Sequence, residues 1–381
     1  MTKATKEIDF LVIGGGMAGL SVAARLAEDA SVIAVEQEVQ PAYHTTGRSA
    51  AMYLEAYGPE EIRILTAASL ADYEKGLQQY ASAPLLTPKD TYNIARADQM
   101  QDLLAMQSDP VYQVQPDLLD ATETRTRIPL LKAGYAEASF REPDAREIDV
   151  DGLLQVFASR FRKQGGELMT NARVSAITRD SANGSQGFRV TTSAGEMQAR
   201  VVVNAAGAWA DEIARLAGIA PLGLQPKRRT IAVIDAPSAA DYETMPFVAD
   251  TEESFYLKPD AGRFLISPAD ETPSPPVDAQ AEEMDIAIVV DRIEKAFDFE
   301  VKRVLRSWAG LRSFFPDGVP VCGFHPDCDD FFWLAGQGGY GIQTAPALSR
   351  VAADLLLRRE SDADVAELGS GAERLAPNRL L

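Results

Sequence analysis

The first forty residues of the chain place two apolar runs on either side of a glycine-rich turn. Residues 9–13 and 31–36 each predict a short strand, the first of them buried and parallel. Between them, apolar residues from Leu20 to Ala27 recur at helical spacing and predict a helix over residues 17–29. This order of strand, turn, helix and strand is typical of a βαβ unit.

The pattern changes at about residue 84. Polar, proline-punctuated sequence follows as far as residue 142, and short apolar runs such as residues 91–95 predict antiparallel strands. The α/β pattern then returns with a helix predicted over residues 150–164. Further elements are expected as strands at 173–178 and 200–204, with a hairpin at Asn183-Gly184 between them.

Residues 221–315 depart from the α/β pattern a second time. Strands are predicted at 230–234 and 263–267, and an acidic, proline-rich loop follows at 270–280. A last strand at 331–335 and a helix at 344–359 close the chain. At 381 residues the chain is longer than single hydrophobic cores usually grow, so we expect two domains that alternate along the sequence.

Composition excludes several classes of partner. The 56 acidic and 37 basic residues give a net charge of -19, which repels nucleic acids and anionic lipid surfaces. Two cysteines and two histidines are too few for a convincing zinc site, so no metal is expected, and unbridged thiols suit a reducing compartment. Because no apolar run approaches the roughly 18 residues that span a bilayer, we expect a cytoplasmic protein, or at most a membrane-peripheral one.

The glycine-rich turn carries the first functional signal. Gly14, Gly16 and Gly19 have the spacing G-x-G-x-x-G between a strand and a helix, and Glu36 ends the next strand about 20 residues later. The glycines allow backbone amides to approach a pyrophosphate, and the acid can accept hydrogen bonds from a ribose diol. The motif predicts a dinucleotide site and disfavours NADP, but it does not separate FAD from NAD.

Three further segments settle that choice by resemblance. Residues 41–51, 202–209 and 336–343 resemble flavin-contacting segments of the family of FAD-dependent D-amino acid and glycine oxidases. The resemblance implies an α/β fold in which a Rossmann-like FAD-binding domain (residues 1–83, 143–220 and 318–381) is interleaved with an antiparallel-sheet substrate domain (84–142 and 221–317). It implies FAD contacts at Gly14, Gly16, Met17, Ala18, Gly19, Glu36, Gln37, His44, Thr45, Thr46, Arg48, Ser49, Ala50, Val174, Ala206, Gly207, Trp209, Gly310, Arg312, Gly338, Gly339, Tyr340, Gly341, Ile342 and Gln343.

The glycine-rich stretch before the last helix also has a physical interpretation. A helix N-terminus directed at the pyrimidine end of the flavin would stabilise the negative charge that develops there on reduction. The alternative is a glycine turn that only caps a strand. Residues 336–341 contain more glycines than such a turn needs, which favours the first interpretation.

The resemblance also implies a substrate site. Arg229, Tyr256 and Arg312 match the residues that fix a substrate carboxylate in the family, and Tyr57 and the Gly339 carbonyl match further pocket positions. An arginine pair suits a carboxylate because its donors match the two oxygens. The alternatives are a surface charge for Arg229, within Lys227-Arg228-Arg229, and a structural ion pair for Arg312.

Two positions depart from the bacterial D-arginine dehydrogenases, which the chain resembles within this family. Met52 replaces a histidine near the substrate, and Thr91 replaces the acid that receives the substrate guanidinium. Without that acid a buried cationic side chain would lack its charge partner, so a neutral side chain is expected. The resemblance implies hydride transfer from Cα of a small amino acid or amine, giving an imino acid that hydrolyses to a 2-oxo acid and ammonia.

Two other functions remain open at this stage. A flavoenzyme of the same fold could oxidise a 2-hydroxy acid, although such a reaction needs a base and Met52 counts against one. A dinucleotide-binding sensor without catalytic activity is the third interpretation. The electron acceptor, a quinone or oxygen, is not specified by the sequence, and resemblance favours a dehydrogenase.

Overall fold

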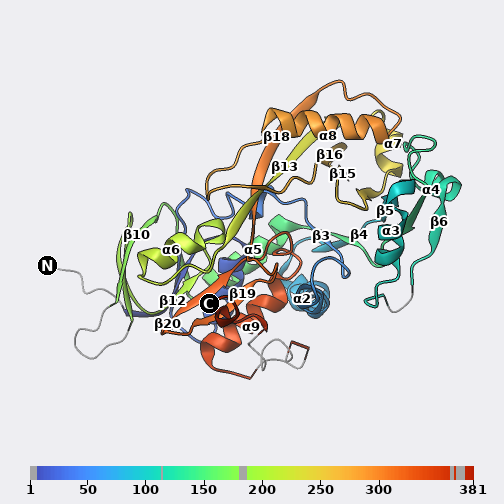
Figure 1. Cartoon of the computed structure of the whole chain (residues 1–381). Helices are drawn as coiled ribbons and strands as arrows, with labels where there is room; N and C mark the ends of the chain where they lie inside the picture. The colour runs from blue at the N-terminus through green and yellow to red at the C-terminus, as the bar shows by residue number, and fades with distance from the viewer. Residues whose placement is uncertain (1–6, 113–114, 180–186, 361–363, 366–373) are drawn as a thin grey trace.

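Two large β-sheets and a small one organise the protein (Figure 1). The computed structural model describes residues 7–112, 115–179, 187–360, 364–365 and 374–381. The hairpin expected at Asn183-Gly184 lies outside these residues. Strands of the first sheet come from residues 7–35, 167–204 and 321–335, and those of the second from residues 91–141 and 225–314.

The first sheet has a parallel centre. Strand β1 (Glu7–Ile13) lies between β2 (Val32–Val35) and β12 (Gly195–Asn204), and all three run parallel. Strand β20 (Cys328–Ala335) extends the parallel part beside β12, as does β9 (Glu167–Met169) beside β2. Antiparallel strands complete the sheet: β10 (Val174–Arg179), β11 (Phe188–Thr192) and β19 (Val321–His325).

Helices cover both faces of this sheet. Side chains alternate between the faces of a strand, so Phe10 and Val12 face one core whereas Leu11 and Ile13 face another. The first core is closed by the helices α1 (Met17–Leu26), α5 (Val150–Lys163) and α9 (Ala345–Leu357), and the second by α6 (Ala210–Leu216). Helix α1 ends three residues before the position expected from its apolar spacing.

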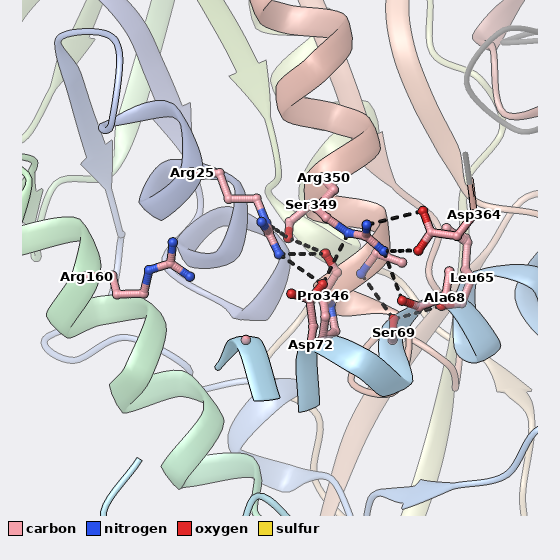
Figure 2. Close-up of polar contacts among 12 residues, drawn as sticks. Arg25, Leu65, Ala68, Ser69, Asp72, Arg160, Pro346, Ser349, Arg350 and Asp364 are labelled. Atoms are coloured by element: carbon pink, nitrogen blue, oxygen red, sulfur yellow. Dashed lines mark hydrogen bonds and ion pairs between the residues drawn. The ribbon is translucent and has the colours of Figure 1, made fainter. Parts of the chain in front are cut away.

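A polar cluster joins the helices on the first face (Figure 2). Helix α2 (Glu60–Ala71) continues into a π-helical turn (Asp72–Gly76), and Asp72 contacts Arg25 of α1 at 3.3 Å and Arg350 of α9 at 3.2 Å. Burial lowers the pKa of Arg25, although the charge of Asp72 opposes this shift. Arg25 also donates to Ser349 Oγ at 2.9 Å, and Arg350 to Asp364 at 2.7 Å. One carboxylate therefore holds three helices together.

The second sheet is antiparallel except at one pair of strands. The long strands β13 (Gln225–Asp235) and β18 (Val304–Phe314) pair along most of their length. From β13 the order continues through β16 (Arg263–Ser267), β15 (Tyr256–Asp260), β14 (Phe247–Asp250), β5 (Thr91–Ala95), β7 (Ala138–Arg141) and β6 (Leu118–Asp120), with β17 (Thr272–Pro273) also beside β13. Only the β5–β14 pair in this order is parallel.

Helix α8 (Glu283–Ala296) covers one face of the second sheet, above the first sheet in Figure 1. This helix was not predicted from the sequence. Its buried residues Val289, Ile293 and Ala296 nevertheless recur at helical spacing. The small sheet consists of β3 (Met52–Tyr53), β8 (Arg146–Ile148) and β4 (Leu86–Pro88). The remaining helices are α3 (Met100–Gln107), α4 (Ala121–Arg127) and α7 (Ala239–Thr244).

The mixed α/β fold expected from the sequence is confirmed, with a parallel and an antiparallel sheet. The expected strands at 91–95 and 263–267 have the observed bounds, and the helix at 150–164 ends one residue early. The domain boundaries proposed above stay a prediction. Within the part of the chain that the structure describes, no helix is both long enough and apolar enough to cross a membrane.

Candidate active site

A single cavity of about 1070 Å³ collects the predicted functional residues. It is lined by residues at the carboxyl ends of β1, β2 and β12 and by residues of β5, β13, β14, β15 and β18 in the second sheet. Every residue that the sequence analysis assigned to the cofactor or the substrate lines it, except Gly19 and Tyr340. Residues that are distant in sequence are thus brought to one site.

The glycine turn at the start of α1 is too tight for side chains. Gly14 has φ +118°, and a Cβ there would lie 2.3 Å from the Ala205 carbonyl oxygen. A Cβ on Gly19 would lie 1.9 Å from the Gly14 carbonyl oxygen, so Gly19 serves the close packing of the helix and does not line the cavity. This is the backbone geometry that a pyrophosphate at a helix N-terminus requires.

Glu36 lies beside this turn with its side chain buried. Its Oε2 accepts a hydrogen bond from the Gly15 amide at 2.7 Å, and its Oε1 accepts one from the Glu38 amide at 3.0 Å. The backbone of Ala172 donates to the Glu36 carbonyl at 2.8 Å, which brings Val174 to the same end of the cavity. The turn, the helix N-terminus and the acid therefore fit a dinucleotide, with Glu36 at the position of a ribose.

The segment after β2 runs from the helix N-terminus to the second sheet. Thr46 Oγ1 accepts from the Met17 amide at 3.0 Å, and Thr45 Oγ1 donates to the Leu311 carbonyl at 2.7 Å. Arg48 lines the cavity, but its guanidinium donates to the carbonyls of Ala279 and Ala309 at 2.7 Å each and pairs with the Asp278 carboxylate. Its charge is neutralised there, so its expected contact with FAD stays a prediction.

His44 lies at the dinucleotide end of the cavity. Its Nε2 is 2.9 Å from Glu38 Oε1, and its ring centroid is 4.6 Å from that of Trp209. Trp209 follows Ala206 and Gly207 in the turn after β12, and all three line the cavity. His44 therefore lies with Glu38 and Trp209, and its assignment to the cofactor stays a prediction.

The glycine-rich turn before α9 packs against β18. A Cβ on Gly338 would lie 2.3 Å from the Phe314 ring, and one on Gly339 would lie 1.8 Å from Arg312 Nη2. Glycine at both positions thus gives Arg312 its place at the cavity. Gln343, which was assigned to the flavin, donates its amide to Thr66 Oγ1 at 2.9 Å.

Arg312 presents unused donors to the cavity. It lies on β18 opposite Lys227 of β13, and Arg229 lies two residues further along β13. Arg312 Nη2 donates to the Tyr57 hydroxyl at 2.9 Å, whereas its buried Nε and Nη1 have no hydrogen-bond partner among the described residues. Only 12% of the Arg312 side chain and 11% of that of Arg229 are exposed. Arg229 Nε donates to the Asp270 carbonyl at 3.0 Å, so the unpartnered donors of this buried pair are those of Arg312, and they fit a carboxylate.

Glu271 is a charged neighbour of the arginine pair that was not predicted from the sequence. Its Oε1 is 3.3 Å from Arg229 Nη2 and 3.5 Å from Arg312 Nη1, and its Oε2 accepts from Lys227 Nζ at 2.8 Å. Burial alone would raise the pKa of Glu271, but the hydrogen bond from Lys227 and the arginine charges lower it below its usual value. An ionised carboxylate therefore already faces both arginines.

The remaining walls are mostly aromatic or uncharged. Tyr256 stacks on Phe247 with ring centroids 5.7 Å apart, and burial raises the pKa of its phenol, which stays protonated. Met52 and Thr91 both line the cavity, as expected for the two positions that depart from the resemblance. Tyr340 lies behind the wall, 4.9 Å from the Tyr57 ring, and burial raises its pKa to about 12.

Metal ligation receives no support from the described residues. No group of three or more histidine, cysteine, aspartate or glutamate side chains among them is arranged to hold a metal ion. Cys322 and Cys328 are buried free thiols, and burial raises the pKa of Cys322 well above its ordinary value.

Comparison with known proteins supports the same cofactor. The family model described as "DAO: FAD dependent oxidoreductase" matches residues 9–355. A glycine oxidase of Geobacillus kaustophilus is 24% identical over 387 residues, covering 95% of this chain and 96% of the relative. An L-2-hydroxyglutarate dehydrogenase of Salmonella houtenae is 27% identical over 225 residues, covering 56% of this chain and 50% of the relative.

Other relatives are longer than this chain. "FAD-dependent oxidoreductase domain-containing protein 1" of Xenopus laevis is 28% identical over 211 residues, which cover 50% of this chain and 40% of that relative. Among solved structures, that of the Geobacillus kaustophilus glycine oxidase has a TM-score of 0.81 at 22% identity, and it covers 95% of this chain and 98% of that one. The fold is therefore shared over almost the whole chain.

Proposed function

Because the chain belongs to the family of FAD-dependent oxidoreductases, we propose that it oxidises a small amino acid of D configuration with an uncharged side chain. The observation that carries this proposal is the arginine pair at the cavity. Arg312 has two buried donors without a hydrogen-bond partner among the described residues, and Arg229 and Arg312 lie 3.3 and 3.5 Å from the same carboxylate oxygen of Glu271. The D configuration rests on the resemblance to D-amino acid oxidising members.

The substrate would be held at its carboxylate and its amine. Arg229 and Arg312 would bind the carboxylate, and each charge-assisted hydrogen bond contributes about 1.5–3 kcal/mol. The Gly339 carbonyl would accept a hydrogen bond from the amine, and the protonated Tyr256 would close the pocket beside Phe247. These contacts would aim the Cα–H bond at the cofactor.

Bound FAD supplies the acceptor for the hydride. The amine loses its extra proton to solvent before the transfer, so its lone pair forms the C=N bond as the Cα–H bond breaks. The resulting imino acid takes up water and gives a 2-oxo acid and ammonia. This route needs no general base from the protein, in agreement with Met52 at the position of the family histidine.

Oxidation of a 2-hydroxy acid is the second candidate, and the relative named for L-2-hydroxyglutarate supports it. The arginines would bind the same carboxylate. An alcohol, however, must lose its proton as the hydride leaves, and a base such as histidine usually takes it. Met52 cannot do so, and His44 pairs with Glu38 at the dinucleotide end. Amino acid oxidation is therefore favoured.

An anaerobic substrate screen tests the proposal. Purified holoprotein is mixed without oxygen with D-amino acids, their L enantiomers and the matching 2-hydroxy acids. The absorbance of the oxidised flavin, at roughly 450 nm, is then followed. Bleaching by D-amino acids is expected. Bleaching by 2-hydroxy acids alone would promote the second candidate, and no bleaching by any compound would support a sensor.

The electron acceptor is a further part of the proposal. We infer from the resemblance to dehydrogenases that a quinone reoxidises the flavin faster than oxygen does. Mixing the reduced holoprotein with a soluble quinone analogue or with oxygenated buffer compares the two rates directly. Faster reoxidation by oxygen would make the protein an oxidase.

A further inference from the structure

A buried carboxylate lies behind the substrate end of the cavity, away from the arginine pair. Glu142 follows β7 and is only 5% exposed. Its two oxygens accept from the Tyr112 hydroxyl at 2.9 and 2.8 Å, and its Oε2 also accepts from Asn93 Nδ2 at 3.1 Å. Among the described residues it forms no ion pair. Burying an ionised carboxylate without a charge partner costs free energy. The proposed chemistry gives this acid no role.

Asn93 connects this carboxylate to the cavity. It lies on β5 opposite Ala249 of β14, which in turn lies opposite Tyr256 of β15, and all three line the cavity. Two strand spacings of about 4.8 Å separate β5 from β15, so Asn93 is roughly 10 Å from the Tyr256 backbone across the sheet. That distance suits the far end of an extended substrate side chain, not its carboxylate.

Glu142 determines which way the Asn93 amide points. An ionised carboxylate only accepts hydrogen bonds, so the amide must turn its NH₂ group toward Glu142. Its Oδ1 is then the acceptor left at the cavity side. Asp250 and Glu253 also line the cavity, but the Asp250 carboxylate is paired with Arg96 at 3.2 Å and accepts from Gln99, so Asn93 carries the argument for a donor.

We propose that Asn93, held by Glu142, determines specificity by accepting a hydrogen bond from the end of the substrate side chain. The inference rests on the proposed function and narrows it: the preferred substrates are amino acids whose side chain ends in an N–H or O–H donor. Asn93 would contact the substrate, and Glu142 would act as a positioning residue through Asn93. An apolar side chain of the same length would leave the Asn93 oxygen without a partner.

The preference should depend on pH because Glu142 titrates within the accessible range. Burial raises its pKa to about 7, although the hydrogen bonds from Tyr112 and Asn93 oppose this shift. Glu55 and Arg63 also act on it, with opposite signs, and Arg63 is itself paired with Asp109. Above pH 7 the carboxylate fixes the Asn93 amide, whereas the protonated acid can donate and allows the amide to flip.

Rates of anaerobic flavin reduction by matched substrates provide the test. D-Glutamine is compared with D-methionine, which has similar length and no N–H donor, in the wild type, Asn93→Leu and Glu142→Gln. The ratio of kcat/KM for the two should favour D-glutamine by about 10- to 100-fold in the wild type at pH 8, the size expected when a buried acceptor is left without its hydrogen-bond partner. Asn93→Leu should bring the ratio to about 1 or below.

Glu142→Gln separates positioning from structural support. It should lower the ratio at pH 8 and remove its change between pH 6 and pH 8, which a loss of stability alone would not do. Asn378→Leu, an exposed asparagine near the C-terminus, is the matched control and should keep the wild-type ratio. If Asn93→Leu does not fold, the pH dependence of the kcat/KM ratio in Glu142→Gln tests the inference in its place.

The outcomes distinguish this inference from the proposed function. A wild-type preference for D-methionine, or an unchanged ratio in Asn93→Leu, would overturn the inference while amino acid oxidation stands. A pH-independent ratio in the wild type would overturn the positioning role of Glu142. Failure of every amino acid to reduce the flavin would instead overturn the proposed function.

Discussion

Replacing Glu271 with glutamine should tighten the binding of carboxylates. Glu271 Oε1 is 3.3 Å from Arg229 Nη2 and 3.5 Å from Arg312 Nη1, so its charge lies where a substrate carboxylate must approach. Glutamine keeps the shape and removes the charge. The arginines would then be less neutralised, and an incoming carboxylate would meet less repulsion.

The size of the effect follows from the separation of the charges and their exposure. Two carboxylates about 5 Å apart repel by about 0.8 kcal/mol in water and about 3 kcal/mol at an effective dielectric constant of 20. The Glu271 side chain is 42% exposed, so the repulsion between the two carboxylates is expected to be near the lower of these two energies. About 1 kcal/mol is therefore expected, or roughly a fivefold lower Kd.

The assay titrates the oxidised holoprotein with benzoate, a carboxylate without an amine, and follows the change in flavin absorbance at constant ionic strength. The matched control is Glu196→Gln at an exposed position on β12, which should leave the Kd unchanged. An unchanged or higher Kd in Glu271→Gln would contradict the proposed competition between Glu271 and the bound carboxylate. It would mean that Glu271 holds the arginines in place and does not compete with the ligand.

Three further substitutions have defined outcomes. Arg312→Met removes two charge-assisted hydrogen bonds, so anaerobic kinetics should show kcat/KM lower by about 10²–10⁴-fold with FAD still bound. Asp72→Asn leaves Arg25 and Arg350 without their shared partner, and urea unfolding should show a loss of about 3 kcal/mol. The pKa of Glu142 is raised to about 7 from an ordinary 4.5, so its contribution to stability is complete below pH 4.5 and lost as the pH rises through 7. In urea unfolding, the free energy of unfolding of Glu142→Gln relative to that of the wild type should therefore rise by about 3 kcal/mol between pH 4.5 and 8. The absence of this rise would contradict the raised pKa of Glu142.

The dinucleotide half of the site could be predicted because its geometry is local. The tight turn needs glycine at positions 14 and 19, and the acid that ends the next strand lies beside that turn in any βαβ unit. Strands β5 and β16 and helix α5 could also be predicted from the local pattern of apolar residues. Helix α8 was missed even though Val289, Ile293 and Ala296 carried the helical spacing that could have revealed it.

The substrate half depends on pairing between distant strands, which no local pattern encodes. Arg229 and Arg312 meet only because β13 and β18 pair with Lys227 opposite Arg312, and resemblance alone pointed to them. Glu271 comes from a loop predicted only to be acidic. Arg48 was assigned to the cofactor by resemblance, which stays a prediction; its guanidinium binds Asp278 and the carbonyls of Ala279 and Ala309.

We propose that this FAD-dependent enzyme takes a hydride from Cα of an amino acid. The most direct measurement is a single anaerobic turnover with a D-amino acid that bleaches the flavin, followed by analysis of the products. One equivalent each of ammonia and 2-oxo acid per flavin reduced is the expected result. Flavin reduction without release of ammonia would contradict it.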